Sequence, residues 1–271
     1  MKSINKTIDR FIERLNGIKL NTKRSNNNNY EIKKKTLITQ TTIESEHIIE
    51  FSKKLPILTR CQVLVVGGGP AGLSAAISSA RCGVDTVIID KFGCFGGVIT
   101  TVGMETIAWY RYEGTTDCSG IGIEMEKMAD KMGGSIKWPY NDSQCLDADF
   151  FKIVADRLIL ESGARPILHC YATDVIIDNR TIKGIIVESK SGRQAILADR
   201  VIDCTGDADI AFFSGVTFRQ NNLKDSLGIT PVFGCSGVNK QQFLEYTEKK
   251  KVPIVNGVKI GLTNVQNTLK I

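Results

Sequence analysis

The chain has 271 residues, of which 42% are hydrophobic and 24% are charged, as in an ordinary globular protein. Its net charge of +6 comes from the first 60 residues, with 13 basic and 6 acidic side chains. The rest is near neutral, which argues against a nucleic-acid partner. No apolar stretch is long enough to span a membrane, so we also expect no membrane partner.

The cysteine pattern argues against a metal centre. The eight cysteines include no CxxC pair, and only two histidines accompany them. A zinc site and a dithiol redox pair therefore both lack their usual ligand spacing. We expect no metal site and a reducing compartment.

Residues 1–55 are expected to form a disordered, basic and asparagine-rich extension. Four asparagines begin at Asn26 and three lysines at Lys33, a composition that builds no core. Earlier apolar residues recur at helical spacing among basic ones, as in a mitochondrial transit peptide, but such peptides avoid acids like Asp9 and Glu13. We expect a cytoplasmic protein, with a mitochondrial location as the alternative.

A glycine-rich turn between two apolar runs opens the globular part. Residues 62–66 and 85–89 are predicted strands, and 72–81 are the predicted helix between them. The turn Gly67-Gly-Gly-Pro-Ala-Gly72 has the G-x-G-x-x-G pattern. Together these parts predict a Rossmann-like βαβ unit that binds a dinucleotide.

Each part of this motif has a physical reason. Gly67 permits a tight turn, Gly69 permits close approach of backbone to a pyrophosphate, and Gly72 permits close packing of helix on strand. The amide groups at the helix start favour phosphate. Asp90 follows Gly72 by 18 residues, where an acid accepts the ribose hydroxyls.

The remaining elements predict an α/β fold. Helices are expected over 122–132 and 147–161, ended by Gly133 and Gly163. An antiparallel β-meander is then expected from four short segments at 167–171, 173–178, 184–189 and 193–197. One more buried strand is expected from Arg200, running into a glycine turn and a helix.

This order of parts resembles the two-dinucleotide-binding-domain flavoproteins. Within them it is similar to the FAD-dependent oxidoreductase group that also includes the flavin subunit of heterodisulfide reductases. The matching stretches are 63–72, 90–97, 120–124, 146–156 and 198–211. The first stretch alone does not separate FAD from NAD, but the Gly96-Gly97 loop and the late Thr-Gly strand favour FAD.

The resemblance implies a domain plan. An FAD-binding domain over 56–237 would have a parallel sheet, helices and the antiparallel meander, with an inserted helical segment at about 100–165. Residues 238–271 would begin a substrate domain that is only partial, because family members have a longer chain.

The resemblance also implies residue roles around FAD. Five residues would face the pyrophosphate: Gly67, Gly69, Pro70, Ala71 and Gly72. Asp90 would bind the adenosine ribose, where the family usually has Glu, with Lys91 beside the adenine edge and Ala172 meeting the adenine through its backbone. Gly96 and Gly97 would form the loop that runs past the diphosphate and the ribityl chain.

At the end of the late strand, the resemblance implies that Thr205, Gly206 and Asp207 close the phosphate side. Asp207 and Asp209 could instead cap the helix that follows. Thr100 either approaches the flavin or ends a strand. Residues 109–111 (Trp-Tyr-Arg) either line a substrate pocket or pack on the surface.

Two further side chains are expected to play no chemical role. His169 lies in an apolar segment, and we expect a core histidine rather than a base. Cys94 precedes the Gly-Gly pair, but a reactive thiol needs an activating neighbour and none is evident.

The function that follows from the resemblance is FAD-dependent oxidation of a small molecule, with flavin accepting a hydride or electrons. No catalytic residue or substrate can be named. The alternative is a truncated, catalytically silent FAD-binding protein, or one needing a partner subunit that supplies the missing C-terminal part. An NAD enzyme of another class is disfavoured, since the Gly-Gly loop and the Thr-Gly strand have no place in it.

Overall fold

The computed structural model describes residues 41–43, 48–50, 52–105, 119–137, 144–218, 232, 236–239, 241–242 and 245–246. The chain divides into two units, Met1–Lys53 and Lys54–Ile271. In the first, β1 (Thr41–Ile43) and β2 (Ile48–Glu50) pair antiparallel within the segment expected to be disordered. The β-branched residues of these two short runs favour strands, although the composition of the whole extension does not.

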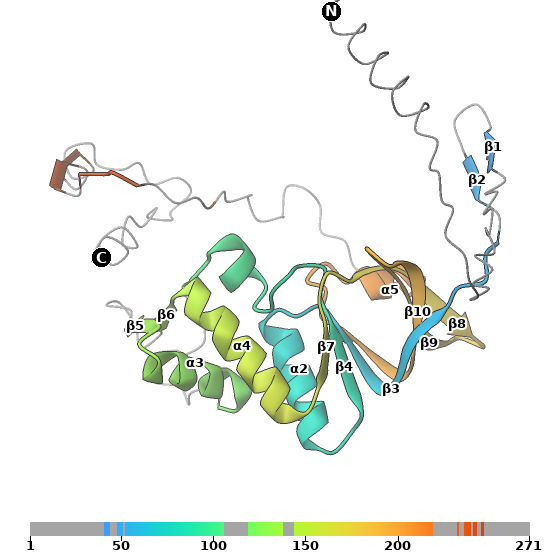
Figure 1. Cartoon of the computed structure of the whole chain (residues 1–271), viewed down its shortest axis with the longest axis horizontal. Helices are drawn as coiled ribbons and strands as arrows, with labels where there is room; N and C mark the ends of the chain where they lie inside the picture. The colour runs from blue at the N-terminus through green and yellow to red at the C-terminus, as the bar shows by residue number, and fades with distance from the viewer. Residues whose placement is uncertain are drawn as a thin grey trace, which may run out of the picture. The chain divides into compact units, whose positions relative to one another are not determined.

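A six-stranded sheet forms the centre of the second unit, in the order β7-β4-β3-β10-β9-β8 (Figure 1). Its strands are β3 (Ile57–Val66), β4 (Thr86–Ile89), β7 (Arg165–Ile167), β8 (Tyr171–Asp178), β9 (Thr181–Ser189) and β10 (Gly192–Asp203). The first half of the sheet, from β7 to β10, is parallel, and β8, β9 and the start of β10 pair antiparallel. The predicted α/β fold with a parallel sheet and an antiparallel meander is confirmed.

Two strand predictions are wrong in detail. Residues 167–171 are no single strand: β7 ends at Ile167 on the far edge of the sheet, and β8 begins at Tyr171 on the opposite edge. His169 between them has a positive φ of 52°, which breaks an extended run. The segments expected at 193–197 and from Arg200 are one strand, β10. It pairs with β9 over residues 192–197 and with β3 over residues 195–203.

Helices α2 (Pro70–Arg81) and α4 (Ala148–Ser162) pack on one face of the sheet, and α3 (Ile121–Lys131) packs against these two helices (Figure 1). Their ends agree with the predicted ranges to within two residues. Asp147 caps α4, its Oδ1 accepting from the amides of Asp149 and Phe150, and Gly163 ends it with φ +85°.

The shorter elements lie before and after these helices. They are η1 (Val98–Val102, one π-helical turn), β5 (Ser135–Lys137), β6 (Gln144–Leu146) and α5 (Asp209–Phe213). β5 and β6 pair antiparallel between α3 and α4. No helix among the described residues is long and apolar enough to cross a bilayer.

Alternate residues of β3 and β4 build two cores, one on each face of the sheet. Val65 and Ile88 pack with Leu73 of α2 and Phe151 of α4. The intervening residues Leu64, Val66, Val87 and Ile89 pack with β9, β10 and α5.

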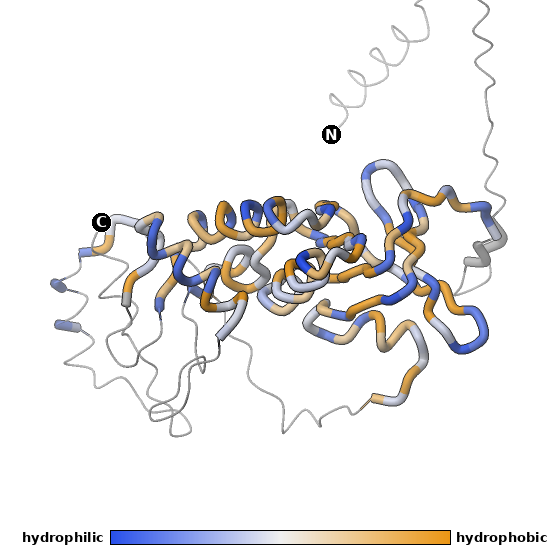
Figure 2. The backbone as a smooth tube through the Cα atoms, turned by 90° about the horizontal axis from the view of Figure 1, so that it is seen from below, coloured by the Kyte–Doolittle hydropathy of each residue, from blue (hydrophilic) through white to orange (hydrophobic). Residues whose placement is uncertain are grey.

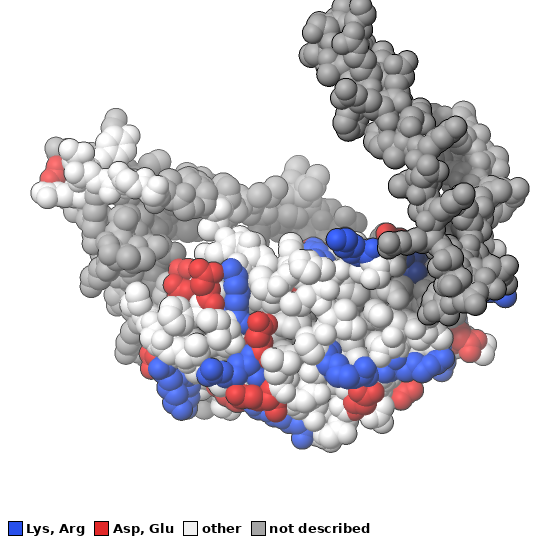
Figure 3. Space-filling view, in the orientation of Figure 1, with Lys and Arg blue, Asp and Glu red and all other residues white. Residues whose placement is uncertain are grey.

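Figure 2 shows hydrophobic and hydrophilic residues alternating along the helices and strands. Basic and acidic side chains lie intermingled on the face in Figure 3.

Candidate cofactor site

A pocket of about 500 Å3 lies where β3, β4 and β10 end and β8 begins. Its walls come from residues 66–71, 89–92, 170–172 and 204–207, with η1 on one side. The carboxyl ends of neighbouring parallel strands form the crevice where open α/β sheets bind ligands. The structure thus brings four distant segments of the sequence to one place.

Most of the predicted site residues line this pocket. These are Gly67, Gly69, Pro70, Ala71, Asp90, Lys91, Gly97, Ala172, Thr205, Gly206 and Asp207. Gly72 and Gly96 lie behind its wall. A Cβ on Gly72 would overlap the Gly67 carbonyl oxygen, and one on Gly96 would meet the Thr100 side chain. These two glycines therefore serve packing, as was expected of Gly72 in holding the helix close.

The glycine turn and the start of α2 fit a diphosphate. Gly67 has φ +100°, and its amide donates to the Ile89 carbonyl at 2.9 Å. Helix α2, described throughout, has no side-chain cap at its N-cap residue Gly69 and no acid in its first turn. Its first amides are therefore left to an anion. A Cβ on Gly69 would approach no protein atom closer than the Gly97 Cα, at 3.7 Å.

Asp90 is held firmly in the pocket wall. It is only 7% exposed, its Oδ2 accepts from the Gly68 amide at 2.6 Å, and its Oδ1 accepts from the Phe92 amide at 2.8 Å. An ionised carboxylate has about four lone-pair sites, so acceptor capacity remains for ribose hydroxyls. The carboxylate thus has a second task that the sequence did not predict, because it anchors the glycine turn.

Two aromatic rings that sequence reasoning missed flank Lys91. Its Nζ lies 5.3 Å from the Phe92 ring centroid and 5.8 Å from that of Tyr171. The rings are 44% and 50% exposed, and both line the pocket. In the sequence, Phe92 follows Lys91 and Tyr171 precedes Ala172, two residues that were assigned to the adenine. This was the signal that could have identified the rings, but only the fold brings the two segments together.

Backbone hydrogen bonds join these two segments. The Asp90 amide donates to the Ile167 carbonyl at 3.1 Å, and the Cys170 amide donates to the Asp90 carbonyl at 2.9 Å. The His169 amide donates to the Phe92 carbonyl at 3.0 Å. His169 itself is exposed, so the expectation of a core histidine is wrong. Its ring lies beside Gly93, where a Cβ would come within 2.7 Å of the His169 Cε1.

The turn after β10 is organised by Asp203, a residue to which sequence reasoning gave no role. Its Oδ1 accepts from the Thr205 hydroxyl at 2.7 Å, and its Oδ2 accepts from the Ala211 amide at 3.0 Å. The Thr205 hydroxyl accepts from the Asp209 amide at 2.9 Å. Asp203 and Thr205 therefore hold the start of α5. The N-cap position falls to Ala208, so the capping alternative for Asp207 and Asp209 is wrong.

The loop after the Gly-Gly pair corrects the prediction for Thr100. Thr100 is buried in η1 and donates to the Phe95 carbonyl at 2.8 Å, so it neither lines the pocket nor ends a strand. Its neighbour Thr101 lines the pocket and donates to the Gly97 carbonyl at 2.7 Å. Cys94 is half-buried away from the pocket lining, and residues 109–111 lie outside the described part.

Two thiols in the pocket wall are held protonated. Burial raises the pKa of Cys170 to about 11. Burial and then the nearby Asp203 carboxylate also raise the pKa of Cys204. A thiol needs to ionise to act as a nucleophile, so both side chains contribute apolar wall rather than chemistry.

The fold and the pocket together define a dinucleotide-binding protein of the Rossmann type. A family model described as FAD dependent oxidoreductase matches residues 62–266. The chain therefore belongs to the FAD-dependent oxidoreductase family, whose cofactor is FAD. The narrower resemblance to the flavin subunit of heterodisulfide reductases stays a prediction.

Individual relatives match only part of this chain. The thiamine thiazole synthase of Methanococcus vannielii is 29% identical over 168 residues, which are 56% of this chain and 59% of that protein. Mitochondrial dihydrolipoyl dehydrogenase of Schizosaccharomyces pombe is 26% identical over 179 residues, 60% of this chain and 31% of that protein. This chain thus spans less than two thirds of the length of either relative.

Among solved structures, a geranylgeranyl bacteriochlorophyll reductase-like protein from Thermoplasma acidophilum superimposes with a TM-score of 0.46. Its sequence is 23% identical, and the match covers 58% of this chain and 42% of that one. THI4 of Thermovibrio ammonificans gives a TM-score of 0.43 at 19% identity, covering 57% of this chain and 61% of that one.

Proposed function

We propose that this chain is the FAD-binding part of an oxidoreductase whose flavin accepts a hydride or electrons from a small molecule. One observation carries the proposal: the glycine turn, Asp90 and the Thr205-Gly206 turn line a single pocket at the end of the parallel strands. Membership of the FAD-dependent oxidoreductase family supports the same conclusion. The alternative of a silent remnant has no observation in its favour.

The proposed division of labour follows the pocket wall. Bound FAD supplies the electron chemistry, and the protein binds and orients it. The first amides of α2 and the turn at Gly67 and Gly69 hold the diphosphate, with the Thr205-Gly206 turn closing the other side. Asp90 accepts the ribose hydroxyls, and the rings of Phe92 and Tyr171 flank the adenine.

The apolar part of the wall has a separate role. Val98 and Val102 of η1 line the pocket beside Gly97, and Thr101 holds that turn through its bond to the Gly97 carbonyl. Apolar side chains at this position exclude water from the ligand, which strengthens every polar contact inside. We propose a reducing, cytoplasmic location, supported by the free thiols of Cys61, Cys82, Cys94, Cys170 and Cys204.

The test is to purify the full chain and record its visible spectrum before and after denaturation. We expect a flavin spectrum and release of FAD rather than FMN, because FMN lacks the adenosine and the diphosphate that the pocket wall is proposed to bind. Anaerobic bleaching by a panel of small reductants would then identify the substrate class. A colourless protein that neither retains nor takes up FAD would refute the proposal, and retention of NAD instead would replace it.

A further inference from the structure

Gly68 occupies a position at which the fingerprint accepts any residue. Its amide donates to Asp90 Oδ2 at 2.6 Å, and its carbonyl accepts from the Gly96 amide at 2.8 Å. This one peptide segment therefore joins the acid of the adenosine side to the second glycine loop. Sequence reasoning assigned nothing to it.

The surroundings of Gly68 leave no space for a side chain. A Cβ would meet the Phe95 ring, with Cε1 at 2.9 Å and Cδ1 closer, and Asp90 Oδ2 at 3.0 Å. Phe95 is 1% exposed and packed in the helical-side core, so its ring has no free direction in which to move. The backbone of Gly68 is not left-handed, so space rather than conformation demands glycine here.

We propose that Gly68 is a positioning residue for the cofactor site. Any side chain there would strike Phe95 and the Asp90 carboxylate, and so would displace the group proposed to bind the adenosine ribose and the adjoining Gly96-Gly97 loop. This inference rests on the proposed binding of FAD. It distinguishes Gly68 from its neighbour Gly69, whose Cβ would meet ordinary contact distances in the protein and would occupy only the space of the ligand.

The experiment compares variants of the full chain: Gly68→Ala, Gly69→Ala, Phe95→Val, and each alanine combined with Phe95→Val. Valine removes the ring atoms that the new methyl group would strike. We expect Gly68→Ala to weaken FAD binding about tenfold to a hundredfold, since a displaced Asp90 carboxylate would lose hydrogen bonds to the cofactor, and loss of a hydrogen bond to a charged group corresponds to this range. Adding Phe95→Val should recover most of the loss for Gly68→Ala and none for Gly69→Ala.

Unfolding midpoints of the same variants separate the inference from the proposed function. Gly68→Ala should lower the midpoint, and its effect should shrink in the Phe95→Val background, whereas Gly69→Ala should be additive with Phe95→Val. If the wild-type chain binds no FAD, the proposed function fails, yet this stability cycle still decides the steric claim. Equal FAD affinity or stability of Gly68→Ala and wild type, or no recovery with Phe95→Val, would overturn the inference.

If the Gly68→Ala chain does not fold, the double variant Gly68→Ala with Phe95→Val decides the question. Recovery of a folded chain that retains FAD supports the steric assignment. Failure of the double variant while Phe95→Val alone folds overturns it, because the ring would then not be the obstacle.

Discussion

Asp90 is one carboxylate with two tasks, since it anchors the glycine turn through Gly68 and faces the pocket. We predict that Asp90→Ala weakens FAD binding about ten- to hundredfold, because hydrogen bonds to a charged group contribute roughly 1.5–3 kcal/mol. Titration of flavin fluorescence measures the change. Asp178→Ala, which removes the same charge from an exposed strand end, should bind FAD as wild type does. Unchanged affinity in Asp90→Ala would refute the ribose assignment.

The ring of Tyr171 tests the adenosine side independently of charge. We predict that Tyr171→Leu weakens FAD binding by about tenfold, since stacking of a base on an aromatic ring contributes roughly 1–3 kcal/mol. Tyr171→Phe keeps the ring and should bind as tightly as wild type. Isothermal titration of the three proteins with ADP would show whether the loss lies in the adenosine half. Equal affinity of the leucine and phenylalanine variants would remove Tyr171 from the site.

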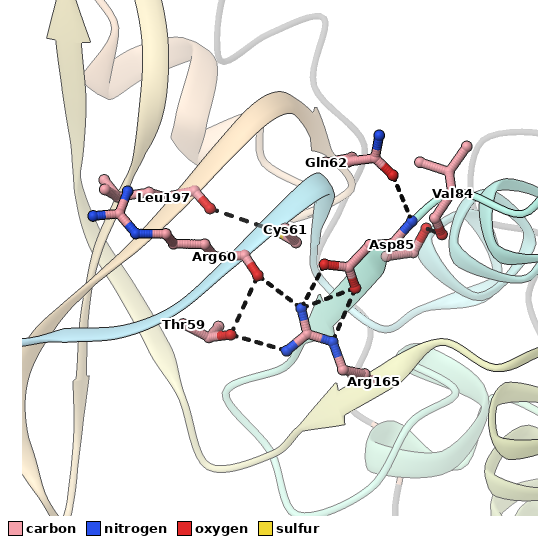
Figure 4. A network of polar contacts seen from close by, with 9 residues as sticks. Thr59, Arg60, Cys61, Gln62, Val84, Asp85, Arg165 and Leu197 are labelled. Atoms are coloured by element: carbon pink, nitrogen blue, oxygen red, sulfur yellow. Dashed lines mark hydrogen bonds and ion pairs between the residues drawn. The ribbon is translucent and has the colours of Figure 1, made fainter.

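At the scale of elements, Arg165 links three of the four parallel strands, β7, β4 and β3, at the end opposite the pocket (Figure 4). Its guanidinium donates from Nε and Nη2 to Asp85 just before β4, and also to the Thr59 hydroxyl and the Arg60 carbonyl in β3. A bidentate pair that also bonds a neighbouring strand contributes more than an isolated exposed ion pair.

We therefore predict that Arg165→Met lowers the free energy of unfolding by about 1–2 kcal/mol, as urea denaturation would measure. Arg193→Met is the matched control. Among the described residues Arg193 pairs with Glu188 within the β9–β10 hairpin, so its loss should have an effect below about 0.5 kcal/mol. Equal effects of the two substitutions would contradict a fastening role for Arg165.

The elements also show what local sequence can predict. The helices, strand β4 and the second half of β3 were foreseeable, because apolar spacing, Asp147 and the closing glycines act within a few residues. The first half of β3, from Ile57, was not predicted. The place of β7 and the continuity of β10 were not, because strand pairing depends on residues far apart in the chain. The roles of Gly68 and Tyr171 were not predicted for the same reason. Phe95 contacts Gly68, and Lys91 contacts the Tyr171 ring, only in the folded sheet.

At the scale of the whole molecule, the reactivity of the cysteines tests which parts of the fold are buried. Burial, followed by the Asp85 carboxylate, raises the pKa of Cys61 to about 11, and burial raises that of Cys170 to about 11. A raised thiol pKa keeps the unreactive protonated form, so at pH 8 about one molecule in a thousand carries the thiolate. Cys82, just after α2, is exposed.

We predict that iodoacetamide at pH 8 labels Cys82 quickly and Cys61 and Cys170 only after unfolding in urea, as peptide mass spectrometry would show. Raising the pH should increase the slow labelling of the folded protein at Cys61 and Cys170 about tenfold per unit up to about pH 10, because below the pKa each unit multiplies the thiolate by about ten. Added FAD should protect Cys204 in the pocket wall but leave Cys61, in the middle of β3 and outside the pocket lining, unchanged. Protection of Cys61 by FAD, or fast labelling of Cys170 in the folded chain, would contradict this arrangement of core and pocket.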